Sequence, residues 1–230
     1  MPDRLRTAIK ETAAYLLMAL KALYFWRREP PVSTLAGLAT YVETRSKFVA
    51  QTTLFSYIKA RVGTRYVAMY EDPLFTESVN IAKWEIYLAS LCDFAIYAVA
   101  TIGRRCAARP SELAALAAHI VDSTIVTEEI PAERPQGFDD IRETFARRAQ
   151  EIAWNQIEPG ANLFQDSLSA LVEWAPIADE LKAYDIEIVK NSMRFKWKKV
   201  RDQFDQVLDA EQVLADWRAI NGEGPESGTG

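Results

Sequence analysis

The chain contains very few of the residues that metal and nucleophile chemistry requires. Its 230 residues include one histidine and two cysteines. One histidine cannot supply the two Glu-x-x-His pairs of a di-iron bundle or the two histidines of a zinc hydrolase. Cys92 and Cys106 have apolar or small neighbours and no CxxC spacing, which is typical of packed thiols in a reducing compartment.

Glycine-rich loops are also missing. The sequence has nine glycines but neither a P-loop nor a GxGxxG motif, and no Gly-x-Ser-x-Gly elbow that would present a nucleophile. These absences exclude the common nucleotide-binding and hydrolase frameworks. We therefore expect no cofactor, and we favour a protein that is not an enzyme.

The apolar residues that are present recur with helical spacing, and no segment alternates as a strand would. Prolines separate predicted helices over about 4–28, 33–62, 75–105, 111–126, 138–157, 161–174 and 177–208, with a short final helix to Ile220. Ser33 is the predicted N-cap of the second helix, and residues 128–137 form the clearest predicted loop. The pattern predicts an all-α fold, an irregular helical bundle of six to eight helices with no significant β-sheet. We expect one helical domain over residues 1–220, with 1–28 as a semi-independent amphipathic helix, and a disordered tail over 221–230.

The longest apolar run, residues 86–102, carries Asp93 near its centre. Its length and this charge favour a buried core helix over a transmembrane one. A buried carboxylate needs a partner or a raised pKa. We favour a buried ion pair with Arg45, which interrupts the apolar stripe of helix 33–62. The alternative is a ligand-binding cavity reached by Asp93, Glu85 and Arg45.

The net charge of −5 hides two basic regions. Residues 1–65 carry +7 and residues 186–201 carry +5, whereas the rest of the chain is acidic. At 100° per residue, one side of helix 177–208 presents a basic stripe, and Phe195 and Trp197 between these residues would stack on bases or enter a membrane interface. The candidates for binding an anionic surface are Arg4, Arg6, Lys10, Lys190, Arg194, Lys198 and Arg201. The alternative is that these charges pair within the fold.

One acidic motif has a known counterpart. Asp139, Asp140 and Glu143 form a DDxxE pattern, which resembles the aspartate-rich motif of the all-α isoprenoid and terpene synthases. The resemblance covers five residues and implies Mg²⁺ held against a diphosphate. Because the motif directly follows Pro135 and Gly137, we favour the simpler interpretation that an aspartate caps a helix and the acids stabilise its first turn.

Together these patterns favour a non-enzymatic helical interaction or adaptor protein. We expect a protein partner, a cytoplasmic location, and peripheral contact with an anionic membrane surface through residues 1–28. A pI near 5.1 argues against nucleic acid. A homo-oligomer would form if the aromatic heptad of helix 33–62 packed against a copy of itself. The alternative function is a bundle that binds or processes an apolar small molecule, including a Mg²⁺-dependent prenyl-type enzyme.

Overall fold

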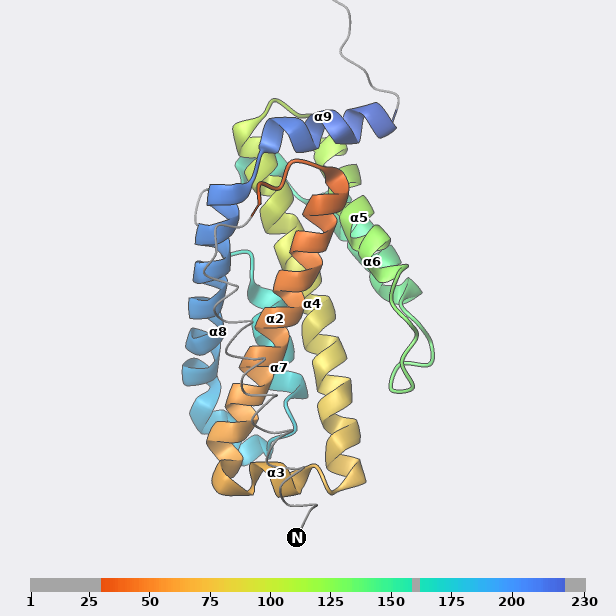
Figure 1. Ribbon diagram of the computed structural model, residues 1–230. Coiled ribbons are helices and arrows are strands. Elements are labelled where there is room, and N and C mark those ends of the chain that lie inside the picture. Colours follow the sequence, from red (N-terminus) through yellow and green to blue (C-terminus); the bar gives the residue numbers. More distant parts are fainter. Residues whose placement is uncertain (1–29, 159–161, 222–230) are drawn as a thin grey trace, which may run out of the picture. The chain divides into compact units, whose positions relative to one another are not determined.

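The computed structural model describes residues 30–158 and 162–221, and this part of the chain is all-α (Figure 1). The helices that it describes are α2 (Leu35–Val62), α3 (Tyr66–Met69), α4 (Pro73–Arg105), α5 (Pro110–Ile125), α6 (Asp139–Glu151), α7 (Gln165–Trp174), α8 (Asp179–Val207) and α9 (Ala210–Ile220). Within the described residues the only extended pairing is a single bridge between Val32 and Leu208. The predicted all-α bundle is therefore confirmed. The predicted helix 1–28, with Arg4, Arg6 and Lys10, and the predicted tail after Asn221 lie outside the described residues.

Polar residues and proline set the starts of α2 and α4, as expected from capping. Thr34, and not the predicted Ser33, caps α2, because its hydroxyl accepts a hydrogen bond from the Gly37 amide at 3.0 Å. Asp72 accepts from the Leu74 amide at 2.9 Å, directly before Pro73 at the first position of α4. At the other end of α2, Gly63 adopts φ +61°, which a glycine tolerates best.

The helix predicted over 138–157 is shorter in the structure, where α6 ends at Glu151. Trp154 is buried, and its indole nitrogen donates to the carbonyl oxygen of Ala149 at 2.9 Å. This bond occupies the carbonyl that the next helical turn would use, so the chain leaves the helix there. Similarly, the helix predicted from residue 161 begins only at Gln165.

Helix α4 lies at the centre of the bundle and packs against α2, α5 and α7 (Figure 1). It is the one described helix that is long and apolar enough to cross a membrane, but 89% of its apolar window is buried inside the bundle. Phe94 on α4 has its ring centroid 5.5 Å from the rings of both Trp197 and Phe204, which come from α8. The apolar surface of α4 therefore faces other helices.

Both ends of α8 are held by α2 and the residues directly before it. Near the C-terminal end, the Val32 amide donates to the Val207 carbonyl at 2.8 Å, and the Asp209 amide donates to the Val32 carbonyl at 2.9 Å. Near the other end, Arg61 of α2 forms an ion pair with Asp185, which is itself buried. These contacts fix which side of α8 faces the core, so they also fix which side faces away from it.

Candidate functional site

The DDxxE carboxylates lie at the start of α6, where each aspartate has an arginine partner. Asp139 accepts from Arg142 at 3.0 Å, and Asp140 forms an ion pair with Arg134 at 2.5 Å. The N-cap of α6 is Phe138, so neither aspartate is the predicted cap, although both lie in the first turn. Glu143 is exposed on the same helix. Within the described residues, no group of three or more potential ligands is arranged to hold a metal ion.

Half-buried Glu85 belongs to a cluster of ion pairs around one buried arginine. Its carboxylate accepts from Arg134 at 2.6 Å, and the same guanidinium donates to the Gly137 carbonyl at 2.9 Å as well as to Asp140. The Arg134 side chain is only 5% exposed. One arginine therefore ties the loop that precedes α6 to the N-terminal half of α4.

Asp93 is fully buried, and its main contact is with the first turn of α7. Its Oδ2 accepts from the Ser167 amide at 2.8 Å, and the indole of Trp197 donates to the Ser167 hydroxyl at 3.2 Å. Among the described residues, Oδ1 of Asp93 has no hydrogen-bond partner. Burial raises the pKa of Asp93 to about 7, and the hydrogen bonds from Ser167 oppose this shift. Asp93 thus joins α4 to α7, and Ser167 in turn joins α7 to α8.

Arg45, the predicted partner of Asp93, lies with its guanidinium carbon 4.8 Å from the ring centroid of Tyr41. Burial lowers the pKa of Arg45 to about 10. The rings of Tyr41 and Phe204 are 5.5 Å apart, so this cation–π pair lies beside the contact between α2 and α8. The ligand-binding role predicted for Asp93, Glu85 and Arg45 stays a prediction.

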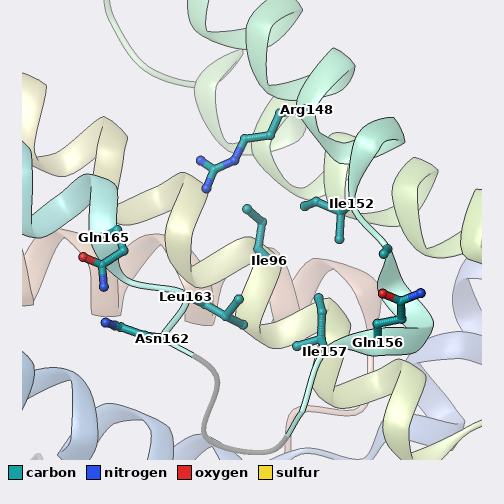
Figure 2. A pocket seen from close by; sticks show the side chains of 9 residues that line it. Ile96, Arg148, Ile152, Gln156, Ile157, Asn162, Leu163 and Gln165 are labelled. Atoms are coloured by element: carbon teal, nitrogen blue, oxygen red, sulfur yellow. The ribbon is translucent and has the colours of Figure 1, made fainter.

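A pocket of about 340 Å³ opens one helical turn from Asp93 (Figure 2). Figure 2 shows Ile96 of α4 and Leu163 near its centre, with Arg148 of α6 above them. The Arg148 guanidinium forms an ion pair with Asp166, so its charge is compensated within the chain. A second pocket of about 400 Å³ lies where Ile81 meets the turn between α7 and α8. Neither Asp93 nor Glu85 lines these two pockets.

The predicted basic stripe runs along one side of α8, where its members differ in their surroundings. Lys198 pairs with Asp202 at 2.7 Å, and Arg194 donates to the Asn191 side chain at 2.8 Å. Lys190 is half-buried. The Arg201 guanidinium lies over the rings of Tyr97 and Phe164, with its carbon 5.7 and 5.6 Å from their centroids. Binding of an anionic surface by these residues stays a prediction.

The two aromatic residues of this stretch have opposite environments. Trp197 is 1% exposed, and its ring centroid lies 4.4 Å from that of Phe164. It is therefore a core residue and does not offer the free ring that base stacking or membrane insertion requires. Phe195 is 72% exposed.

Phe195 belongs to an apolar stripe on the outer face of α8. With Leu181, Tyr184 and Ile188 it falls within a sector of about 60° at 100° per residue, on the side away from the core. Tyr184 and Ile188 are 82% and 71% exposed, and Leu181 is also exposed. We name these four residues the outer stripe. Within the described residues, no other helix shows four exposed large apolar side chains in one row.

Of the outer stripe, only Phe195 was predicted from the sequence to be exposed for binding. Three of its four residues, Leu181, Ile188 and Phe195, recur at intervals of seven. This spacing was available in the sequence, but the core residues Val189, Met193 and Val200 already accounted for the helical periodicity. Comparisons of the chain with models of protein families, with curated proteins and with solved structures found no match.

Proposed function

We propose that this chain is a helical interaction protein that binds another protein through the outer face of α8. The observation that carries the proposal is the outer stripe, an apolar row about four helical turns long on the exposed side of a helix whose opposite side is fully buried. Large apolar side chains gathered on one face are typical of protein-binding surfaces, whereas isolated ones are ordinary.

The charges of α8 favour a protein over a lipid surface. Its N-terminal part, residues 179–189, has four acidic residues and one basic residue, whereas residues 190–201 have six basic residues and no acidic one. An anionic membrane would attract only the second part and repel the first. A protein partner with both kinds of charge complements the whole face.

Site-specific photo-cross-linking tests the proposal. A benzophenone amino acid is placed at Ile188, at the centre of the outer stripe, and, as a matched control, at Gln150, an exposed position on α6. After irradiation of cells that express the full chain, we expect a discrete protein band from position 188 that position 150 does not give. We also expect Tyr184→Lys to abolish this band, because it places a charge in the apolar row.

Two results would contradict the proposal. In the first, positions 188 and 150 give the same pattern. In the second, the band from position 188 persists when Tyr184 carries a charge. A circular dichroism melt of each variant shows that the fold is unchanged, as expected for substitutions at positions that are exposed.

A further inference from the structure

The outer stripe has the seven-residue spacing of a helix that pairs with another helix. Leu181, Ile188 and Phe195 occupy one heptad position, and Tyr184 and Asn191 occupy the position three residues later. We propose that a second copy of this chain covers the outer face of α8, with the two α8 helices packed antiparallel. This inference rests on the proposed function, because it names the partner of the same surface.

The charges next to the stripe match this arrangement. A charged residue directly precedes each of Leu181, Ile188 and Phe195. These residues and the next one in the same heptad position are Glu180, Glu187, Arg194 and Arg201. In an antiparallel pair, residues at this heptad position on one helix lie across from residues at the same position on the other helix, which runs in the opposite direction. Glu187 then lies across from Arg194 of the second copy, and Glu180 lies across from Arg201 of the second copy.

A parallel pair would bring no opposite charges together at these positions. There, the same heptad position faces the one five residues later on the other helix. Glu180 would face Asp185, which Arg61 of its own chain already neutralises, and Glu187 would face the uncharged Ser192. The order of charges along α8 therefore selects the antiparallel orientation.

The apolar residues fit the same register. When Glu187 faces Arg194, Tyr184 lies across from Phe195 of the second copy, and Ile188 lies across from Asn191. The three most exposed members of the outer stripe would thus be covered. A polar asparagine in the middle of such a seam fixes orientation and register and lowers affinity.

One pair of helices buries less surface than the roughly 800 Å² per partner of a typical stable interface. We therefore expect a reversible dimer with a dissociation constant of about 1–100 μM. Within one chain Glu187 and Arg194 form an ion pair at 3.6 Å with both side chains exposed to solvent, so dimerisation would exchange this pair for the same pair between the two copies.

Analytical ultracentrifugation of the full chain at about 1–200 μM tests the proposal through charge reversal. We expect Glu187→Arg and Arg194→Glu each to weaken the dimer by about tenfold or more, because each homodimer then brings like charges together. An equimolar mixture of the two variants should dimerise about as well as the original chain, since one carries two arginines and the other two glutamates. Glu143→Arg, a reversal on the exposed side of α6, should leave the dimer unchanged.

A chain that stays monomeric at about 200 μM would overturn the second copy as the occupant. In that case a cross-link from position 188 to a different protein would still support the proposed function, so the two failures can be told apart. A dimer that neither reversal weakens, or a mixture that fails to restore association, would overturn the antiparallel pairing of α8.

Discussion

The inner and outer faces of α8 carry the same kinds of side chain, but only one of them is covered. On the inner face, Trp197 and Phe204 are almost completely buried against α4, whereas Tyr184 and Phe195 on the outer face are among the most exposed side chains of their type. The difference shows that apolar composition does not decide burial here. Directional contacts decide it, namely the ion pair of Asp185 with Arg61 and the hydrogen bond from Trp197 to Ser167.

Removal of an inner-face aromatic residue should have the largest effect on stability. Trp197→Ala deletes a buried indole that lies within 5.5 Å of the Phe94 and Phe164 rings and donates to Ser167. We expect the free energy of unfolding to fall by about 3–5 kcal/mol, because a cavity remains and a buried hydroxyl loses its partner. Urea unfolding measures this loss. Trp174→Ala, at a partly exposed tryptophan, is the control, and an equal loss there would contradict the contrast.

The same contrast between covered and open sites applies to ion pairs. Arg134→Ala removes the buried guanidinium that holds Glu85, Asp140 and the Gly137 carbonyl. We expect a loss of about 2–3 kcal/mol in the free energy of unfolding, because Glu85 and the Gly137 carbonyl lose the buried guanidinium that they contact. Arg142→Ala is the control, since the pairs that Arg142 forms are solvent-exposed. A loss at Arg142 as large as that at Arg134 would show that burial does not set the difference.

Buried Asp93 makes the stability of the fold depend on pH. Its pKa in the folded chain, about 7, lies above its value in the unfolded chain. The stability that it contributes is therefore complete below about pH 4 and is lost as the pH rises to about 7. Between pH 5 and 7, the free energy of unfolding of the Asp93→Asn variant should fall by about 2 kcal/mol less than that of the original chain. Urea unfolding at each pH tests this, and equal slopes for the two chains would exclude Asp93 as the source.

The helices could be predicted well from the sequence because they depend on local spacing and on breakers. For α4 and α8 the predicted ends lie within two residues of the observed ones, and the predicted loop over 128–137 lies between α5 and α6. The capping predictions were less accurate, since Thr34 replaces Ser33 and Phe138 precedes the two aspartates. Small shifts of this kind depend on backbone geometry that spacing does not determine.

The partners of the buried charges could not be predicted, because they come from distant parts of the chain. Glu85 meets Arg134 across 49 residues, and Asp93 meets Ser167 across 74. Each contact depends on the path of a loop, which composition and periodicity do not describe. The outer stripe was missed for a different reason, because a helix with apolar residues on two faces gives one periodic pattern that the core face alone explains.

The smallest effect on stability is expected on the open side of α8. Phe195→Ala should change the free energy of unfolding by no more than about 0.5 kcal/mol in dilute solution, because a side chain that is 72% exposed loses few contacts. Urea unfolding at about 0.1 μM, below the expected range of dissociation constants, measures it. A loss near that of Trp197→Ala would mean that Phe195 packs within its own chain, and the outer stripe would then be part of the core. A phenylalanine that contributes almost nothing to folding in the monomer is instead free to contribute to binding, so the same substitution should weaken association at high concentration.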